Sequence, residues 1–331
     1  MFKDRFMNVC RDQLNDFDFL CEMIKSHEVQ QLVKIFLCMS ATGQKHDEHV
    51  LCEAMMDISM LEDEIISISK EKSRVPVAEI AWSKRASHWN WVREVKSNLD
   101  EYIWVYSLLC DDWSKETFHR ILLCRFLLDY SCLYPTYRPI AYYDWDVLEK
   151  KESVVLVDCG AYDGNSVLDF IERYGNNYKR IYAYEPTPKS FHKMEKSTVS
   201  HKNIVLRNSG VGEYDGILKF HSNSEASNFI IWDNPEFASI SVPVVSLDND
   251  IEMPVSFIKM DIEGSEMNAL RGAKCHIVYD KPQLAICVYH LLEDLRTIPR
   301  LIHSYNKNQK FYMRNHEEGL AGELVFYADP F

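Results

Sequence analysis

The sequence lacks any apolar run close to the ~20 residues that a membrane-spanning helix needs. Its first residues lead into a polar helix rather than an apolar signal region, so no secretory signal is expected. The ten cysteines include no CxxC pair and no spacing typical of a zinc knuckle, and several lie inside apolar runs. We therefore expect buried free thiols, a reducing compartment and a cytoplasmic location.

Basic residues are also scarce relative to acidic ones. The chain has 37 Lys and Arg against 50 Asp and Glu, which gives a formal net charge of −13. A broad nucleic-acid-binding surface would need a basic face, so this class of partner is not expected. The hydrophobic content of 47% is ordinary for a globular protein, and 331 residues are enough for two domains of roughly 100–200 residues.

The first half of the chain has the pattern of helices. Apolar residues recur at helical spacing over 15–39, 49–68, 91–110 and 114–130. Ser114 is the expected N-cap of the last of these helices. Segment 133–139 contains two prolines and is expected to be a connector. We predict an all-helical N-terminal domain over residues 1–145, and its helices are the candidate surface for homo-oligomer formation.

Beyond the connector, short β-branched runs alternate with helical stretches. Strands are expected at 154–157, 181–184, 204–206, 255–260 and 284–289, with helices at 165–174 and 188–197. This alternation indicates a mostly parallel sheet covered on both faces. The last two apolar runs, 310–314 and 323–327, are expected to form an antiparallel pair at the sheet edge. The fold class predicted for residues 146–331 is therefore α/β, with a Rossmann-like sheet.

The turn after the first predicted strand is the most informative segment. In sheets of this kind ligands bind at the carboxyl ends of strands, glycines let the backbone approach them, and the next helix offers free N–H donors. The turn lacks the G-x-G-x-x-G spacing of dinucleotide-binding proteins, and two acids flank it. It suits a cationic, phosphate-free ligand such as S-adenosylmethionine, and an ordinary strand–helix turn is the alternative. Its residues are Asp158, Cys159, Gly160, Ala161, Tyr162, Asp163, Gly164, Asn165 and Ser166.

An acid also ends the second predicted strand. Glu185, followed by Pro186, lies some 20–25 residues beyond the glycine turn, where a carboxylate can accept hydrogen bonds from both ribose hydroxyls. Enzymes that bind NAD and enzymes that bind S-adenosylmethionine share this arrangement. Glu185 alone therefore fits either ligand, and only together with the turn does it favour S-adenosylmethionine.

Charged residues end the next two predicted strands as well. Lys259 and Asp261 lie on one face of a strand that should be buried on both, so each needs a partner, and a structural ion pair is one explanation for Lys259. Asp261 and Glu263, at the end of that strand, are candidate catalytic residues. His290 ends the neighbouring strand and is the first candidate for a general base or a ligand, against the alternative of a structural histidine.

Together these motifs resemble the FkbM family of methyltransferases over about residues 140–331. The resemblance implies a class I methyltransferase fold, an S-adenosylmethionine donor and, in most members, O-methylation of a sugar, polyketide or other secondary metabolite. It further implies that Asp158, Gly160, Gly164 and Glu185 hold the cofactor. It says nothing about the first hundred residues. The matching segments are 158–164, 184–186, 258–266, 270–273, 288–290, 311–316 and 324–328.

The function predicted from the sequence is methyl transfer from S-adenosylmethionine to a hydroxyl of a small-molecule or glycan acceptor. The residues that would bind the cofactor are Asp158, Cys159, Gly160, Ala161, Tyr162, Gly164, Asn165, Ser166, Glu185 and Pro186. His290, then Asp261 or Glu263, would act as the base. In a variant these three residues hold a divalent cation that lowers the pKa of the hydroxyl, and the sequence does not decide between the two.

Other functions share the predicted fold. A nicotinamide-dependent oxidoreductase is disfavoured by the missing G-x-G-x-x-G, and a non-catalytic S-adenosylmethionine-binding scaffold is disfavoured by the intact acid and glycine positions.

His46 and His49 have a metal-like spacing but no further ligands nearby, so a solvated helix start is expected there. The basic and aromatic stretch 82–91 could meet a membrane, glycan or partner, but we expect its tryptophans to pack inward.

Overall fold

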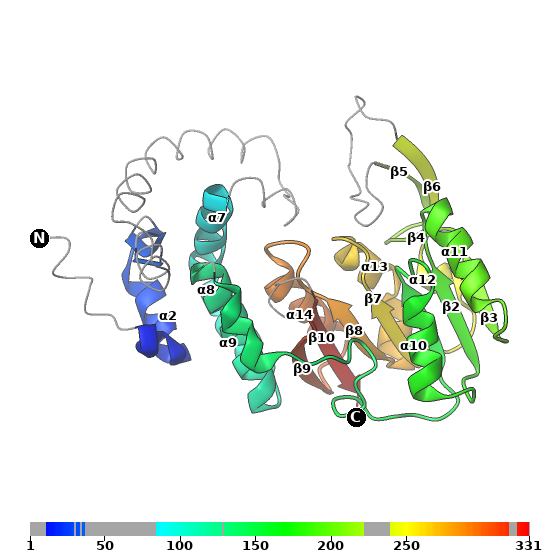
Figure 1. Ribbon diagram of the computed structural model, residues 1–331, viewed down its shortest axis with the longest axis horizontal. Helices are drawn as coiled ribbons and strands as arrows, with labels where there is room; N and C mark the ends of the chain where they lie inside the picture. The colour runs from blue at the N-terminus through cyan, green and yellow to red at the C-terminus, as the bar shows by residue number, and fades with distance from the viewer. Residues whose placement is uncertain are drawn as a thin grey trace, which may run out of the picture.

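The computed structural model describes residues 11–29, 31–33, 35–36, 84–127, 129–221, 239–317 and 323–330. The predicted helix at 49–68, together with His46, His49 and Trp82, lies outside the described residues. A seven-stranded sheet in the order β3-β2-β1-β7-β8-β10-β9 forms the centre of the described fold (Figure 1). Its strands are β1 (Val155–Cys159), β2 (Arg180–Tyr184), β3 (Ile204–Arg207), β7 (Phe257–Met260), β8 (Gln283–Cys287), β9 (Gln309–Asn315) and β10 (Leu324–Pro330).

Strands β1, β2, β3, β7 and β8 are parallel, and β10 runs antiparallel to both β8 and β9. The predicted mostly parallel sheet with an antiparallel C-terminal edge is therefore confirmed. A second, three-stranded sheet has the order β4-β6-β5. Its strands are β4 (Gly210–Val211), β5 (Gly216–His221) and β6 (Ser239–Val245). The helices between the strands are α10 (Asn165–Tyr174), α11 (Pro188–Thr198), α12 (Leu247–Asp250), α13 (Glu266–Gly272), the π-helical turn η3 (His276–Asp280) and α14 (Asp294–Tyr305).

Successive residues of a strand point to opposite faces, and each face of the large sheet has its own hydrophobic core. Leu156 and Phe257 belong to the core that contains the buried residues of α10. Val157 and Ile258 belong to the other core, which contains buried residues of α13, α14 and the N-terminal helices. The sheet is thus covered on both faces, as its near-continuous apolar strands predicted.

The described helices before the sheet depart from the prediction at their ends. The predicted helix 91–110 is two helices, because Asn98 leaves the helical conformation between them with φ −125° and ψ 23°. Ser114 does not cap the next helix, which begins two residues earlier; instead the backbone N–H of Ser114 donates to the Asp111 carboxylate over 2.6 Å. The predicted connector also contains a 3₁₀ helix. These elements are η1 (Arg11–Asn15), α2 (Phe17–Ser26), α7 (Lys84–Ser97), α8 (Leu99–Leu108), α9 (Asp112–Leu127) and η2 (Tyr130–Thr136).

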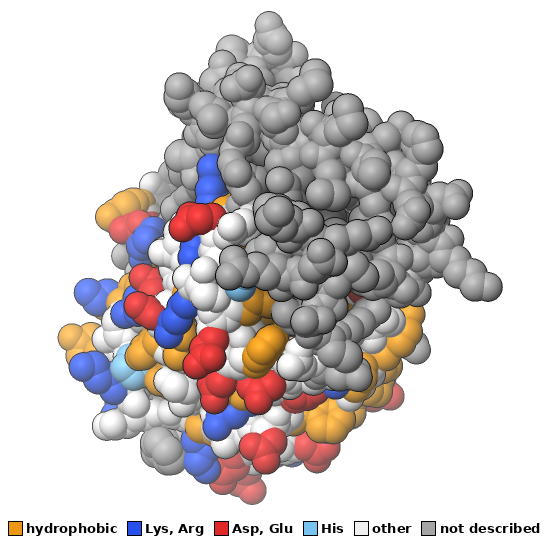
Figure 2. All heavy atoms as spheres, turned by 90° about the vertical axis from the view of Figure 1, so that its left-hand side faces the viewer, with side chains coloured by type: hydrophobic (Ala, Val, Ile, Leu, Met, Phe, Trp, Pro, Cys, Tyr) orange, Lys and Arg blue, Asp and Glu red, His pale blue; other side chains and the backbone are white. Residues whose placement is uncertain are grey.

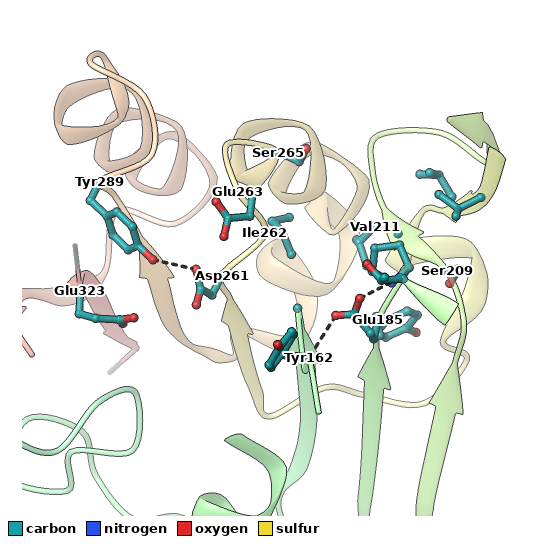
Figure 3. A pocket seen from close by; sticks show the side chains of 17 residues that line it. Tyr162, Glu185, Ser209, Val211, Asp261, Ile262, Glu263, Ser265, Tyr289 and Glu323 are labelled. Carbon is teal, nitrogen blue, oxygen red and sulfur yellow. Dashed lines mark hydrogen bonds between the residues drawn. The ribbon is translucent and has the colours of Figure 1, made fainter. Parts of the chain in front are cut away.

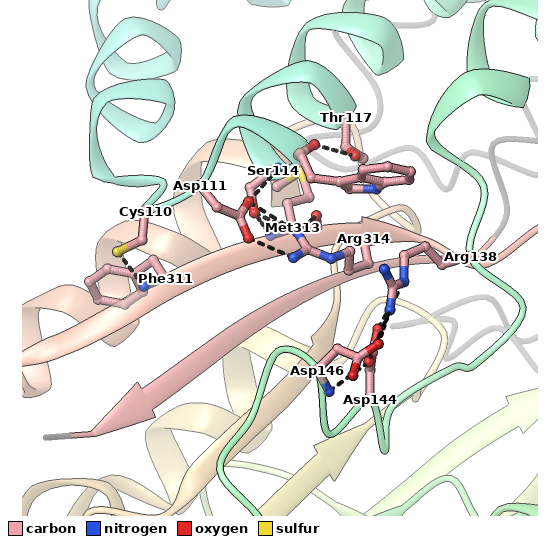
Figure 4. A network of polar contacts seen from close by, with 11 residues as sticks. Cys110, Asp111, Ser114, Thr117, Arg138, Asp144, Asp146, Phe311, Met313 and Arg314 are labelled. Atoms are coloured by element: carbon pink, nitrogen blue, oxygen red, sulfur yellow. Dashed lines mark hydrogen bonds and ion pairs between the residues drawn. The ribbon is translucent and has the colours of Figure 1, made fainter.

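The N-terminal helices contact the edge strand β9 directly (Figure 4). The backbone N–H of Cys110 donates to the carbonyl of Phe311 over 2.9 Å, so the chain just before α9 pairs with this edge. The buried Arg314 guanidinium reaches the Asp111 carboxylate at 2.6 Å and the Ser114 hydroxyl at 2.7 Å. The helices therefore cover the edge of the sheet, and the division into two domains at residue 145 stays a prediction.

The expectation of buried free thiols is met for some of the described cysteines and not for others. All seven described cysteines are free, and Cys21, Cys124, Cys159 and Cys287 are buried, but Cys110 and Cys275 are exposed, contrary to expectation.

Trp91 packs inward as predicted, with the Arg125 guanidinium 4.3 Å from its ring centre. On the face in Figure 2, acidic and basic side chains of the described residues are interspersed. None of the described helices combines the length and apolarity needed to cross a bilayer.

Candidate functional site

A cavity of about 350 Å³ opens at the carboxyl ends of β1, β2, β3 and β7 (Figure 3), a volume within the range of small-molecule sites. Valine side chains from β4 and β6 line one end, which we call the apolar end (Val211, Val242 and Val244). Carboxylates line the other, which we call the acid end (Asp261, Glu263 and Glu323). Of the residues singled out from the sequence, the cavity wall contains Gly160, Tyr162, Glu185, Pro186, Asp261 and Glu263.

The glycine turn is shaped by its approach to β7. Gly160 has φ +79°, and a Cβ at this position would lie 1.9 Å from the backbone oxygen of Asp261. The close approach of the chain after β7 therefore requires a glycine at this position. The sequence alone predicts that the glycine is needed for contact with a ligand. Gly164 has φ +90° at the start of α10, where a Cβ would lie 2.6 Å from the Ser197 hydroxyl.

The Glu185 carboxylate is held from both sides by backbone amides. The N–H of Tyr162 donates to its Oε2 over 3.1 Å, and the N–H of Thr187 donates to its Oε1 over 2.8 Å. Burial raises the pKa of Glu185, while the hydrogen bonds from Thr187 and Tyr162 act in the opposite direction. The carboxylate is therefore an oriented acceptor at the wall of the cavity.

Other predicted residues of the turn lie behind the wall. Asp158 is fully buried, 3.0 Å from the Nζ of Lys259, and accepts a hydrogen bond from the Ser166 hydroxyl over 2.5 Å. The structural ion pair considered for Lys259 is therefore present, with Asp158 as its partner. The Asn165 side chain donates to the Asp163 carboxylate over 3.1 Å. Cys159, Ala161, Gly164, Asn165 and Ser166 are likewise not among the residues that line the cavity.

Two tyrosines hold Asp261 at the acid end. The Tyr142 hydroxyl lies 2.9 Å from Oδ2 of Asp261, and the Tyr289 hydroxyl donates to Oδ1 over 3.2 Å. Burial acts to raise the pKa of Asp261, but the positive charges of Lys259 and His290 outweigh it and hold this pKa below its usual value. Asp261 is therefore an ionised group with most of its lone pairs occupied, which makes it a weak proton acceptor.

His290 is buried among carboxylates. Its Nδ1 lies 2.9 Å from Glu266, and its Nε2 lies 3.4 Å from Asp261 and 3.6 Å from Glu263. Burial opposes the charged ring, but these three carboxylates prevail and raise the pKa of His290 to about 10. The ring is then an imidazolium at neutral pH, and a protonated ring cannot accept a proton. This argues against His290 as the base in this state of the protein.

Glu263 and Glu323 have the pKa values that a base near neutral pH requires. Burial is the main cause that raises the pKa of Glu263 to about 7, and burial together with Asp261 raises that of Glu323 to about 7. The Tyr142 hydroxyl also lies 3.0 Å from Glu323, so it bridges this carboxyl group and Asp261. A phenol has one proton, so one of the two carboxyl groups must carry a proton for both contacts to be hydrogen bonds.

Some of these side chains also have the proximity of metal ligands. Among the described residues, one such cluster contains Asp261, Glu266 and His290, and another contains Asp261, Cys287 and Glu323. The set expected from the sequence, with Glu263 beside Asp261 and His290, is not one of these clusters. The contacts of His290 are those of an imidazolium among carboxylates.

Several residues of the cavity wall were not singled out from the sequence. Glu323 precedes β10, Tyr289 follows β8, and Ser209 follows β3. The Ser209 hydroxyl is buried and has no hydrogen-bond partner among the described residues, so it is a candidate to pair with a ligand. Tyr142 comes from the segment before the predicted boundary at residue 145, and it reaches the acid end through its contacts with Asp261 and Glu323.

A known protein family matches the segment that contains most of the residues of this site. Residues 158–307 match the family described as the methyltransferase FkbM domain. This part of the chain is therefore similar to the FkbM methyltransferase domain. It contains Glu185, Asp261, Glu263 and His290, whereas Tyr142 and Glu323 lie outside the matched residues. The resemblance stated from the sequence is confirmed.

Solved structures agree with the fold. The chain is similar to the crystal structure of methyltransferase FkbM from Methylobacillus flagellatus KT, with 24% identity, a TM-score of 0.62, and coverage of 73% of this chain and 62% of that chain. The chain thus spans less than two thirds of that protein, and the likeness bears on the fold. No curated protein sequence is significantly similar to the chain.

Two further structures show a weaker likeness. An rRNA methylase from Streptococcus thermophilus has 15% identity, a TM-score of 0.35, and coverage of 56% of this chain and 91% of that chain. Aeropyrum pernix fibrillarin in complex with natively bound S-adenosyl-L-methionine has 12% identity, a TM-score of 0.33, and coverage of 55% and 68%. At these TM-scores neither structure bears on the site.

Proposed function

We propose that the protein is an S-adenosylmethionine-dependent methyltransferase that methylates a hydroxyl oxygen of a small-molecule or glycan acceptor. The observation that carries the proposal is a single cavity that joins the oriented carboxylate of Glu185 to a cluster of carboxylates at the end of β7. The cavity lies within the segment that matches the FkbM domain, with Glu323 added from the chain just before β10.

The apolar end fits the adenosine portion of the cofactor. Valine side chains can cover the faces of the base. The buried Ser209 hydroxyl, for which the described residues offer no hydrogen-bond partner, can pair with a polar edge of the base. Glu185 can accept hydrogen bonds from the ribose hydroxyls, because each of its oxygens already has one backbone donor that fixes its direction. The rest of the cofactor then extends past Gly160 and Tyr162 toward the acid end.

The reaction is an in-line displacement. When bound, S-adenosylmethionine supplies an electrophilic methyl group whose bond to sulfur breaks as the bond to the acceptor oxygen forms, with the electron pair left on sulfur. The wall of the cavity holds the reacting groups in line, and orientation of this kind can contribute much of the acceleration. The proton of the hydroxyl must pass to a base, because a neutral alcohol is a poor nucleophile.

Glu263 is the proposed base. It lines the cavity, and its pKa of about 7 lets it accept a proton near neutral pH while remaining partly ionised. Asp261 is held at a low pKa by Lys259 and His290, which makes it a weaker base. His290 is proposed to be the counter-ion that holds Asp261, Glu263 and Glu266 together.

A divalent cation held by Asp261, Glu263 and His290 is the alternative from the sequence, and it would polarise the acceptor hydroxyl. It has less support from the geometry, because the described side chains whose donor atoms converge around His290 are those of Asp261 and Glu266, not Asp261 and Glu263. A metal would also have to displace the proton of the His290 ring. The proposed reaction uses the side chains alone.

Calorimetric titration of the full chain with S-adenosylmethionine, adenosine and NAD tests the proposal. S-adenosylmethionine and adenosine should bind at one site, and NAD should not, because its pyrophosphate would meet the acidic wall. Tight binding of NAD without binding of S-adenosylmethionine would favour a nicotinamide-dependent enzyme instead. Binding of S-adenosylmethionine without methyl transfer to any hydroxylated acceptor would leave a non-catalytic scaffold.

A further inference from the structure

The acid end has fewer cations than carboxyl groups among the described residues. Lys259 contacts Asp158 and the carbonyl oxygen of Gly160, over 3.0 and 2.8 Å, and is fully buried behind the cavity wall. His290, also buried, has its closest contact with Glu266. Within the part of the chain that the structure describes, Glu263 has only the longer 3.6 Å contact with His290, and Glu323 forms no ion pair with a Lys, Arg or His.

Hydrogen bonds do not supply a cation to this end either. The Tyr142 hydroxyl has one proton for its contacts with Asp261 and Glu323, so it can donate to only one of the two at a time. The Nε2 of His290, buried between Asp261 and Glu263, makes no hydrogen bond within accepted geometry. The groups that face the cavity here are thus carboxyl groups and the Tyr289 hydroxyl (Figure 3). A positive group that enters the cavity would be attracted to them.

We infer that Glu263 and Glu323 make the acid end selective for positive charge, so that the protein distinguishes the cationic sulfonium of S-adenosylmethionine from the neutral thioether of S-adenosylhomocysteine. The inference rests on the proposed function, which places adenosine at Glu185 and the sulfur beyond it. The product, which differs from the cofactor by the methyl group and its charge, is then bound more weakly than the cofactor. The same charge rejects acceptors that carry phosphate or carboxylate beside the reacting hydroxyl.

Calorimetry with three adenosyl compounds tests the inference without knowledge of the acceptor. S-adenosylmethionine carries a sulfonium, sinefungin carries a protonated amine at the same position, and S-adenosylhomocysteine carries neither. At pH 8, above the pKa of about 7 that burial gives to Glu263 and Glu323, the wild-type protein should bind the two cations at least about ten-fold more tightly than the thioether, because an opposite charge nearby is attractive in a cavity of low dielectric. Glu323→Gln should lower that ratio at least about five-fold, through weaker binding of the two cations and nearly unchanged binding of the thioether.

Two further variants keep the test decisive. Glu263→Gln should act in the same direction as Glu323→Gln, and it replaces the latter if that variant does not fold. Glu172→Gln removes the same charge from an exposed position on α10 and should leave the ratio unchanged. Equal or tighter binding of S-adenosylhomocysteine by the wild type, or equal weakening of all three compounds in the variants, would overturn the inference. Failure of all three compounds to bind would reject the proposed function itself.

Discussion

The two ends of the cavity are built in different ways. Glu185 is fixed by backbone amides of the nearby Tyr162 and Thr187, so its position follows from the local turn. The acid end is fixed by side chains from distant parts of the chain, among which Tyr142 joins Asp261 to Glu323. A backbone-held acceptor suits a constant ligand, whereas a cluster of titratable side chains suits proton transfer and can change with the acceptor.

If proton transfer takes place at the acid end, Glu263→Gln should have the largest effect on turnover of all the variants considered. The amide cannot take the hydroxyl proton, so turnover on a hydroxylated acceptor should fall by roughly 10²–10⁴-fold. In the wild type, kcat should rise with pH through about 7 as Glu263 ionises, and this rise should be absent from the variant. Initial rates of S-adenosylhomocysteine formation across pH measure both. If turnover of the variant stays within three-fold of the wild type, Glu263 is not the catalytic base.

His290→Gln should lower the free energy of unfolding. The variant leaves the fully buried Glu266 without its counter-ion, and loss of one partner of a buried ion pair costs about 3–5 kcal/mol. Because the pKa of His290 is raised to about 10 in the folded protein, its stabilising effect is complete below about pH 6.5 and is lost as pH rises toward 10. Denaturant unfolding across this range should show the decline in the wild type and not in the variant.

A surface histidine provides the control for that experiment. His192 on α11 pairs with Glu195 at an exposed position, so His192→Gln should change the unfolding free energy by less than about 0.5 kcal/mol. If His290→Gln is equally harmless, the imidazolium is not the counter-ion that its contacts indicate, and the role of His290 as a neutral base would be open again.

Glu185→Gln should produce a smaller effect, confined to binding. The neutral amide loses one charge-assisted hydrogen bond to the ribose, and such bonds are worth roughly 1.5–3 kcal/mol, so affinity should fall by about ten-fold or more. Adenosine and S-adenosylmethionine should weaken alike in this variant, whereas Glu323→Gln should leave adenosine unaffected. Calorimetry of both ligands against both variants measures how separate the two ends are. Unchanged affinity in Glu185→Gln would show that the ribose lies elsewhere.

Removal of metal ions should have the smallest effect. Since His290 already supplies a positive charge among the carboxylates, incubation with EDTA should leave both turnover and S-adenosylmethionine affinity within about two-fold. Loss of turnover on chelation, with recovery on addition of Mg²⁺ or Mn²⁺, would establish the metal-dependent alternative and reassign Asp261 and His290 as ligands.

The contrast between the two ends also explains what the sequence could predict. The turn at Gly160 and the acid at Glu185 follow strands whose apolar runs are visible, and local spacing was sufficient to place both at one edge of the sheet. The pKa of His290 was not predictable, because it depends on Glu266 at the start of a different helix. Tyr142 gave no local signal at all, since its contacts lie more than 100 residues away in the chain.

Glu323 could have been found from the predicted topology. A strand antiparallel to its neighbours begins at the edge where the parallel strands end, so the residue before β10 had to lie near Asp261 and His290. The antiparallel direction that the sequence predicts for this run is therefore sufficient to place Glu323 at the acid end. The helix ends were harder to predict, because the break at Asn98 and the start at Asp112 depend on single backbone conformations and caps.

The edge contacts between α9 and β9 have a consequence for the order of events during synthesis. Asp111 and Arg314 are 203 residues apart in the chain. At about 5–20 residues per second, a ribosome that has made Asp111 needs roughly 10–40 s more to make Arg314. The helices therefore leave the ribosome well before the strand they cover exists. They must hold their apolar side chains together or be shielded by a chaperone during that interval, and the sheet is completed only when β9 and β10 emerge at the end.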